Sequence, residues 1–487
     1  MANRELLEAL ARGMTPEMKQ FFAKALKSRF RPAEPPAPGP EWWQKPGLGI
    51  MYQTEYRPGW HWNRDFEAFN RSMKGPDGKL AFNGPFCRVE DWVRASAAAG
   101  VDYHIMEIKW HDGICYFDTS LTEWKTPVDY ALQFAEASRK AGIPFLYYYS
   151  SIFDHNPQFD PIQPSRRTAS FIGIPPKAEY EEYIKGQYRE IMERYRPDGM
   201  WIDWYWPDGP TEATIRFFRE TYPEVVLAFN AANLQPGSYS RLDYTSGEGH
   251  DLDGPYLKIL KEETGTMAVF SSTWKWASLN RRMFTHRWEL ISPAGRWWED
   301  PRTRDDPYDL PRMAAVTMAC GGLHCTGVAA QMDGSLYAEQ AEQLEILGAW
   351  YRPRKSLFSG SAPLPYGSAK PPGVNVTPSS VRPIACVSGG DRILHLVNMD
   401  GATRPISVEL RGRSWRAVDS AWLEPEGAPL ELKKTKAGFS LSIAKRQVDP
   451  VDTIVRLSGR FWRHGNRRPD LSAPCRKRKD GAPGPRC

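Results

Sequence analysis

Residues 89–109, VEDWVRASAAAGVDYHIMEIK, contain a helix pattern that is followed at once by an apolar strand pattern. Apolar residues recur at helical spacing from Val89 to Ala99, Gly100 offers a helix stop, and Val101–Lys109 has the length of a strand. Helices that lead directly into apolar strands are typical of sheets whose strands run parallel. This stretch therefore predicts an α/β fold.

Similar units repeat on both sides of this stretch. Helix patterns cover Pro127–Ala141, Glu179–Tyr195, Thr211–Thr221 and Met313–Cys320. Strand patterns cover Gly47–Gln53, Ile143–Tyr149, Gly199–Trp204, Val225–Asn230, Leu242–Ser246, Met267–Ser271 and Leu323–Val328. The number of units favours a (β/α)8 TIM-like barrel over an open, doubly wound sheet. The chain has no strand followed by GxGxxG and no GxxxxGK[ST], so the common nucleotide-binding fingerprints are absent from the sequence.

The pattern changes after about residue 364, where short runs of alternating apolar and polar residues begin. In Phe439–Ile443 the apolar residues share one face, as in an antiparallel strand. We therefore expect a C-terminal antiparallel β-sandwich. The predicted order is an N-terminal helical extension and proline-rich linker (1–41), the barrel (42–362), the β-sandwich (363–458) and a basic, disordered tail (459–487).

Charge and cysteine usage exclude several classes of protein. The 487 residues carry a net charge of +6, but nine Lys and Arg against two Asp lie in the tail alone, which leaves the body close to neutral. A neutral body argues against an extensive nucleic-acid-binding face. Seven scattered cysteines without a CxxC pair indicate reduced thiols. With no signal peptide or transmembrane segment recognised, the sequence predicts a cytoplasmic protein that does not bind membranes.

Carboxylates follow two of the predicted strands, where the active-site face of a barrel lies. Asp203 ends an apolar strand among Trp and Tyr residues, although an acid there can also cap loop amides. Glu248 follows Leu242–Ser246 and stands between two glycines, although it can also be an exposed loop acid. Spacing alone does not separate Glu248 from its neighbours Asp243, Asp251 and Asp253. Two carboxylates in an aromatic barrel mouth are what glycoside hydrolysis requires.

The predicted strand that ends at Lys109 contributes further polar residues. Strict alternation places Glu107, Lys109 and His111 on the same side, toward the barrel mouth. His111 can orient a sugar hydroxyl, or it can be a loop histidine with its own partners, and Lys109 can supply a cation near Asp203. There is no HxH or HExxH spacing, and His104 has the opposite parity from His111. We therefore expect neither a metal nor another cofactor.

Five motifs occur in order and together resemble the α-L-fucosidase family of glycoside hydrolases. They are Gly49–Gln53, Lys109–Gly113, Leu146–Ser150, Trp201–Asp203 and Asp243–Glu248, within roughly Trp42–Trp298. The resemblance implies a retaining enzyme with a (β/α)8-like barrel and a C-terminal β-sandwich. It places the nucleophile on Asp203 and the acid/base on Glu248, with Glu289 as the rival. The substrate-binding residues are then Gln53, His61, Trp62, Lys109, Trp110, His111, Tyr149 and Trp204.

Some sugar-binding positions depart from the family pattern. Gln53 stands where the family has a histidine, Trp110 replaces the first histidine of its His-His-Asp-Gly motif, and His61-Trp62 best matches its Glu-Trp pair. The sequence thus predicts a divergent member, a retaining exo-glycosidase that acts on an α-L-fucoside or a related glycoside. The alternative is a non-catalytic carbohydrate-binding or scaffold protein on the same fold. The oligomeric state stays open.

Overall fold

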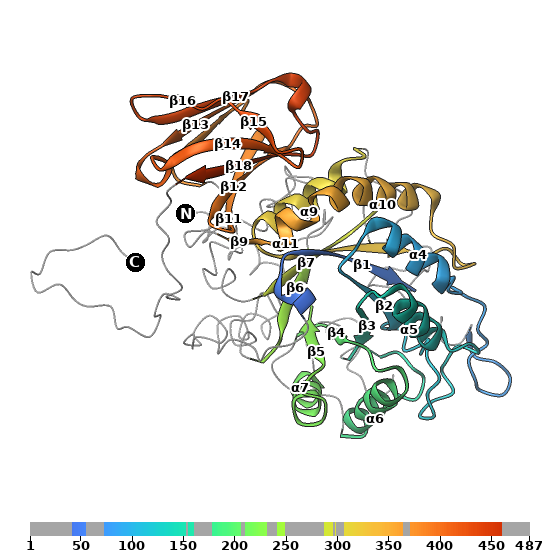
Figure 1. The fold of residues 1–487 in the computed structure, drawn as a ribbon. Helices are drawn as coiled ribbons and strands as arrows, with labels where there is room; N and C mark the ends of the chain where they lie inside the picture. Colours follow the sequence, from blue (N-terminus) through green and yellow to red (C-terminus); the bar gives the residue numbers. More distant parts are fainter. Residues whose placement is uncertain are drawn as a thin grey trace, which may run out of the picture.

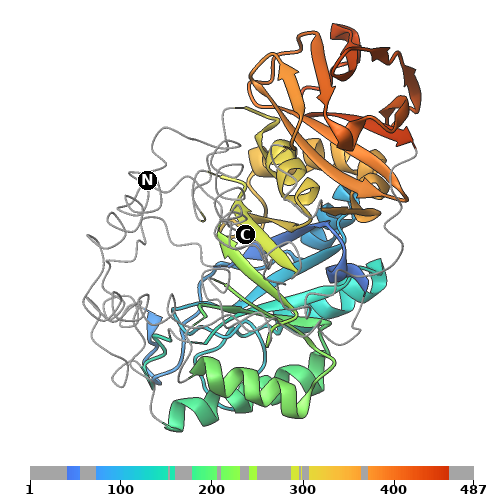
Figure 2. The same cartoon turned by 90° about the vertical axis from the view of Figure 1, so that its left-hand side faces the viewer.

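The computed structural model describes residues 41–54, 73–151, 154–159, 178–205, 210–230, 241–248, 287–295, 298, 306–363 and 371–459. The predicted N-terminal extension and linker, the strand at Met267–Ser271, the site residues His61 and Trp62, and the tail beyond Gly459 lie outside these ranges. Figures 1 and 2 show the described part as a barrel with a smaller β-sheet domain packed beside it.

The barrel is a closed parallel sheet in which eight strands pair in chain order, and β1 pairs with β8. The strands are β1 (Gly47–Gln53), β2 (Tyr103–Lys109), β3 (Phe145–Ser150), β4 (Gly199–Asp203), β5 (Val226–Phe229), β6 (Tyr244–Glu248), β7 (Trp288–Pro293) and β8 (Leu323–Ala329). Nearly every strand residue is buried, as expected when helices cover the outside of a parallel sheet. The predicted (β/α)8 barrel is therefore confirmed. Strand β7 was not predicted from the sequence.

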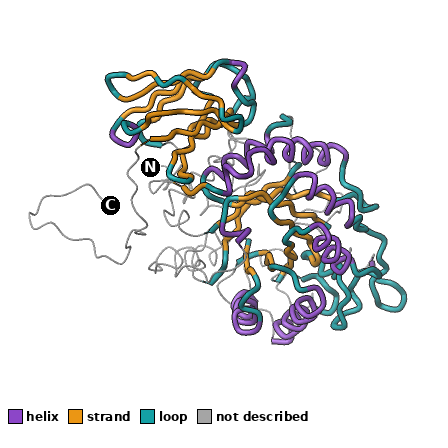
Figure 3. The backbone as a smooth tube through the Cα atoms, viewed as in Figure 1, coloured by secondary structure: helices purple, strands orange, loops and turns teal. Residues whose placement is uncertain are grey.

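Helices lie against the outside of much of the barrel, as Figure 3 shows by colour. They are α4 (Val89–Ala99), α5 (Tyr130–Ala141), α6 (Ala178–Tyr195), α7 (Pro210–Thr221), α9 (Asp309–Ala319), α10 (Ala338–Tyr351) and α11 (Lys355–Ser359). The predicted stop at Gly100 is present, because its backbone has φ 72° and its N–H donates to the carbonyls of Ser96 and Ala97. Within the described ranges, no helix has the length and apolar character that crossing a membrane requires.

The C-terminal domain consists of two antiparallel sheets, which confirms the predicted β-sandwich. One sheet has the order β10 (Val374–Thr377), β13 (Ile406–Arg411), β17 (Gly438–Ile443) and β16 (Lys433–Lys434). The other has the order β15 (Ala428–Leu430), β14 (Val418–Glu424), β18 (Asp452–Gly459), β12 (Asp391–Asn398), β11 (Val381–Ser388) and β9 (Ser361–Pro363). Gly459, the first residue of the predicted tail, is thus the last residue of β18.

The sandwich packs on the barrel through α9 and α11. Strands β11 and β12 contact α9, and the Arg312 guanidinium of α9 donates to the Pro450 carbonyl. Phe358 of α11 stacks on His395 of β12, with ring centroids 5.1 Å apart. Apolar side chains of both domains are buried together at this junction, so the two domains share one continuous core.

Candidate active site

A pocket opens at the carboxyl ends of the barrel strands, which is where barrel enzymes place their chemistry. Its lining side chains come from nearly every strand or from the residues just after it. They are Met51, Gln53, Glu107, Trp110, His111, Tyr148, Trp201, Asp203, Trp204, Asn230, Glu248, Ile291 and Trp298. Of the residues predicted for the site, the structure brings together Gln53, Trp110, His111, Asp203, Trp204 and Glu248.

Asp203, the last residue of β4, is held by three neutral donors. Its Oδ1 accepts from the Trp204 backbone N–H (3.0 Å) and the Asn230 amide (2.9 Å), and its Oδ2 accepts from the Tyr148 hydroxyl. Burial raises the pKa of Asp203 to about 7, the Tyr148 hydrogen bond opposes that rise, and the nearby charge of Glu248 adds to it. Trp204 adopts a left-handed backbone with φ 61°. Such strain in a non-glycine residue is common at functional sites.

Asn230 links the two candidate carboxylates. Its side-chain nitrogen, just beyond β5, lies 2.9 Å from Asp203 Oδ1 and 2.7 Å from Glu248 Oε1. The distance between Asp203 Oδ1 and Glu248 Oε1 therefore cannot exceed the sum of these two N···O distances. Retaining glycosidases hold their two carboxyl groups about 5–5.5 Å apart, and this bridge is compatible with that separation.

His111 forms part of the wall beside Asp203. Its Nδ1 lies 2.7 Å from Ser150 Oγ, its Nε2 lies 3.4 Å from Asp203 Oδ2, and its ring stacks on Trp110 with centroids 4.9 Å apart. Burial lowers the pKa of His111 well below its ordinary value, and His155 and Lys109 lower it further. The imidazole is therefore neutral, and it can donate to or accept from a hydroxyl group.

Lys109 does not belong to this pocket, which corrects the prediction made from strict alternation. The pairing of β2 with β3 shifts between Glu107 and Lys109, so two residues of β2 oppose one of β3. The extra residue turns the Lys109 side chain outward, where it pairs with Asp154 and donates to the Tyr149 hydroxyl (3.0 Å). A cation near Asp203 is thus not supplied by Lys109.

Tyr149 is a second correction, because it faces the outer layer. Its hydroxyl donates to the Gln187 side chain of α6, and its ring packs on Tyr188 with centroids 4.9 Å apart. The neighbouring residue Tyr148 points inward and donates to Asp203. Because side chains alternate along β3, only one of Tyr148 and Tyr149 can face the pocket. The run of tyrosines in the sequence does not show which of the two it is.

Glu289, the rival acid, lies inside the barrel rather than in the pocket wall. It precedes Ile291 of the wall by two residues, so it faces the same side one layer deeper. Its carboxylate accepts from Trp201 Nε1 (2.7 Å), Ser246 Oγ (2.6 Å) and Tyr103 Oη (2.5 Å). Burial raises its pKa, and these hydrogen bonds oppose the rise. Among the described residues, Glu289 is thus a fully buried carboxyl group that does not line the pocket.

Seven lining residues are not among the predicted site residues: Met51, Glu107, Tyr148, Trp201, Asn230, Ile291 and Trp298. Of these, alternation along the strand had already placed Glu107 toward the barrel mouth. Asn230 directly follows a predicted strand, which is the signal that also marked Asp203. Trp298 lies against β8, where a Cβ at Gly327 would be 2.6 Å from its ring. Glycine at 327 is therefore required for the tryptophan to reach the pocket. No sequence signal of comparable strength marks Trp298.

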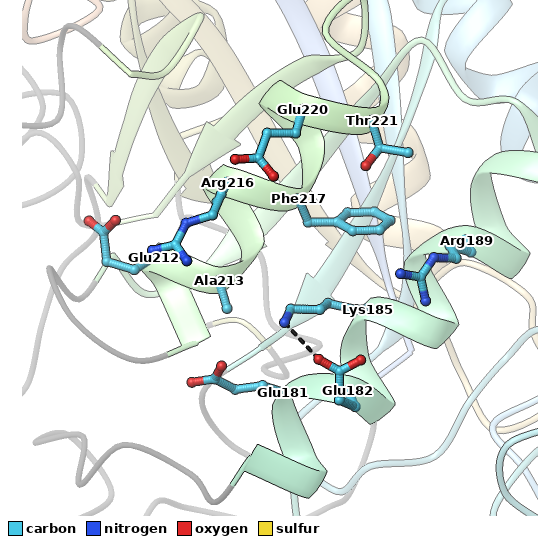
Figure 4. A pocket seen from close by; sticks show the side chains of 10 residues that line it. All are labelled: Glu181, Glu182, Lys185, Arg189, Glu212, Ala213, Arg216, Phe217, Glu220 and Thr221. Carbon is cyan, nitrogen blue, oxygen red and sulfur yellow. Dashed lines mark hydrogen bonds and ion pairs between the residues drawn. The ribbon is translucent and has the colours of Figure 1, made fainter.

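A second, charged groove lies on the outside, between α6 and α7 (Figure 4). The Lys185 ammonium pairs with Glu182 there at 2.9 Å, and Arg189 lies over the Phe217 ring. Acidic and basic side chains both line this groove. Among the described residues, no group of three or more His, Cys, Asp or Glu side chains could hold a metal ion in either place.

A barrel whose mouth holds two linked carboxylates among tryptophan rings is the architecture of a glycoside hydrolase. The chain belongs to the α-L-fucosidase family, whose model matches residues 41–355. It is a glycoside hydrolase by family and fold.

Solved structures agree on the fold. The α-fucosidase of Thermotoga maritima in complex with fucose is 17% identical, covers 86% of this chain and 97% of its own, and has a TM-score of 0.62. α-L-Fucosidase isoenzyme 1 from Paenibacillus thiaminolyticus is 20% identical over 86% and 98%, with a TM-score of 0.59. A trapped covalent intermediate of an α-L-fucosidase from Bacteroides thetaiotaomicron is 14% identical over 89% and 99%, with a TM-score of 0.61. A search among curated protein sequences gave no match.

Proposed function

We propose that this protein is a retaining exo-glycosidase that hydrolyses an α-L-fucoside or a related glycoside by double displacement. The observation that carries the proposal is the Asn230 side-chain nitrogen, which contacts both Asp203 and Glu248 in one aromatic pocket. Two structural neighbours support it: the Thermotoga maritima α-fucosidase is in complex with fucose, and the Bacteroides thetaiotaomicron α-L-fucosidase is a trapped covalent intermediate.

In the first step Asp203 attacks the anomeric carbon, while Glu248 gives its proton to the departing oxygen. The bond to the leaving group breaks, and an ester forms between the sugar and Asp203. In the second step Glu248 takes a proton from water, and the water oxygen attacks the same carbon. The ester bond breaks, and Asp203 and Glu248 return to their starting protonation states.

The surroundings of Asp203 fit the role of a nucleophile. Tyr148, Asn230 and the Trp204 N–H offset part of the cost of burying its charge, and no cation is required. Because burial raises the pKa of Asp203 to about 7, the ionised nucleophile is the minor form in the free enzyme below that pH. We expect kcat/KM to rise with pH through about 7. A rate that is already constant from pH 5 upward would contradict this role.

The decisive experiment removes each carboxylate in turn. Asp203→Gly should abolish turnover of aryl α-L-fucosides, and azide should restore it by forming a glycosyl azide of inverted configuration. Glu248→Ala should spare substrates with good leaving groups, since these need the least help from an acid. Glu289→Gln is the matched control, and it should show no dependence on the leaving group.

Three outcomes would overturn parts of the proposal. Near-normal turnover by Asp203→Gly removes Asp203 as nucleophile. Leaving-group dependence in Glu289→Gln instead of Glu248→Ala moves the acid/base role to Glu289. If the wild type binds sugars but hydrolyses none of a panel of aryl glycosides, the carbohydrate-binding alternative is correct.

A further inference from the structure

Glu107 is a third carboxyl group in the pocket wall, and the two-step reaction does not use it. Its side chain comes from β2 and lines the same pocket as Asp203 and Glu248, yet it is only 1% exposed. A buried carboxyl group without a ligand is costly, so its presence at a binding surface needs a reason.

The contacts of Glu107 fall on one of its two oxygens. The Thr54 backbone N–H (3.1 Å) and the Thr54 hydroxyl (2.8 Å) both donate to Oε1. A carboxyl oxygen has two lone pairs, and these donors use both of them. Among the described residues, Oε2 receives no hydrogen bond. When Glu107 is neutral, its proton therefore belongs on Oε2, which is the oxygen that remains for a ligand.

The charges around Glu107 favour this neutral form. Burial raises the pKa of Glu107 to about 8, the Thr54 side chain opposes the rise, and the charges of Asp112 and Asp203 add to it. From the other elements packed here, His111 is neutral because burial lowers its pKa, and the Cys87 thiol is neutral because burial raises its pKa.

The described part of the pocket wall gives Glu107 no compensating cation. Glu248 adds a further carboxylate on the opposite side of the pocket, and none of the described lining residues is a lysine or an arginine. A negatively charged sugar would meet three carboxyl groups here, so the wall is suited to a neutral ligand.

We infer that Glu107 determines which sugar the pocket accepts, by donating a hydrogen bond from Oε2 to a hydroxyl group of a neutral pyranose. This inference rests on the proposed function and makes it more specific, because it assigns recognition of the sugar to a residue beside Gln53. A site built to donate to a hydroxyl rejects sugars that lack it. The three carboxyl groups of the pocket wall also disfavour uronic acids, which carry a negative charge.

The test compares binding of L-fucose, by isothermal titration calorimetry at pH 6 and pH 9, to the wild type and three variants. Glu107→Gln keeps a donor in place of Oε2, Glu107→Leu removes it, and Glu136→Gln makes the same chemical change at an exposed residue of α5. At pH 6, Glu107→Gln should bind within about threefold of the wild type. Glu107→Leu should bind about 10- to 100-fold more weakly than the wild type. Glu136→Gln should bind as tightly as the wild type.

At pH 9 only about one Glu107 in ten would still carry its proton, so the wild type should bind about 10-fold more weakly than Glu107→Gln. The other titratable groups of the pocket are present in both proteins, so their effects cancel in this ratio. L-Galacturonate, which has a carboxylate in place of the fucose methyl group, should bind the wild type at least about 10-fold more weakly than L-fucose at both pH values.

Failure of this inference can be told from failure of the proposed function. If L-fucose binds but Glu107→Leu binds it like the wild type, or the ratio of Glu107→Gln to wild type is the same at both pH values, Glu107 has no such role. Binding of L-galacturonate as tight as that of L-fucose overturns the neutral-sugar part. If the wild type binds neither L-fucose nor another neutral monosaccharide, both proposals are wrong.

Discussion

A histidine lies beside a buried aspartate in two regions of the molecule, the pocket and the β-sandwich. In the pocket, His111 Nε2 is 3.4 Å from Asp203 Oδ2, and its imidazole is neutral. In the sandwich, His395 Nδ1 is 2.7 Å from Asp452 Oδ2. Burial there would lower the pKa of His395, but the charge and hydrogen bond of Asp452 raise it to about 10, so this pair is ionic.

A cysteine also lies beside the His395–Asp452 pair of the sandwich. Cys386 Sγ lies 3.6 Å from His395 Nε2, so cysteine, histidine and aspartate follow one another as in thiol enzymes. All three side chains are fully buried at the junction of the domains, and no opening reaches them among the described residues. The same residue types thus line an open pocket in one place and form a closed, buried link in the other. The two histidine–aspartate pairs differ in two respects: only the first lines a pocket, and only the second carries charge on its histidine.

The largest effect is expected from Asp203→Asn, which removes the proposed nucleophile. The turnover number should fall by about 10⁴-fold or more. Burial raises the pKa of Asp203 to about 7 in the folded protein, above its ordinary value, so the charged form reduces stability increasingly from about pH 4 to pH 7. Asparagine removes that cost, and the melting temperature at pH 8 should equal or exceed that of the wild type. A large drop in melting temperature would show that Asp203 is structural, like Asp452.

Asp452→Asn should have the opposite profile. It leaves His395 buried without its anion, so the free energy of unfolding should fall by about 3–5 kcal/mol at pH 6, while the turnover number of folded enzyme stays unchanged. The folded pKa of His395 is raised to about 10, so the stabilisation is complete below about pH 6.5 and is lost as pH rises toward 10. Urea unfolding of both proteins at pH 6 and pH 10 measures this difference, which should be smaller at pH 10. A constant difference would mean that His395 is not charged.

His111→Phe should affect recognition more than stability. Loss of a polar contact with a ring hydroxyl should lower kcat/KM by about 1–3 kcal/mol of transition-state binding, which is roughly 5- to 150-fold. Trp110→Phe gives a comparison within the same wall, since it keeps an aromatic face beside His111 and removes only the indole N–H. Unchanged kcat/KM in His111→Phe would take His111 out of the site.

Deletion of residues 460–487 should have the smallest effect. The tail has little apolar periodicity, so it has little surface to bury, and the melting temperature should change by less than about 2 °C, with full activity. The matched deletion from residue 452 also removes β18 and the Asp452 partner of His395, and it should unfold the sandwich. A drop of many degrees in the shorter deletion would show that the tail packs on the body.

Sequence patterns predicted the barrel because its signals are local. Apolar strands, helix stops such as Gly100 and the change to alternating runs each depend on a few neighbouring residues. Strand ends were informative for the same reason, and Gln53, His111, Asp203 and Glu248 do line the pocket. The assignment of their roles stays a prediction.

The wrong predictions for site residues come from features that depend on how separate segments of the chain pack together. The outward turn of Lys109 depends on how β2 pairs with β3, and the choice between Tyr148 and Tyr149 depends on the position of the barrel axis. Trp298 reaches the pocket only because residue 327 has no side chain, which is a relation between distant parts of the chain. Such relations are set by tertiary packing, so alternation within one segment cannot predict them.

The extra residue of β2 keeps two electrostatic systems apart. On its outer side the Lys109 ammonium and the Asp154 carboxylate neutralise each other among three tyrosine rings, and on its inner side the carboxyl groups of the pocket face a ligand. Because this irregularity leaves both Ile108 and Lys109 on the outer side of β2, the ammonium group stays out of the pocket. In engineering terms, substitutions in the pocket wall can change its charge without disturbing the Lys109–Asp154 pair on the other side of the strand.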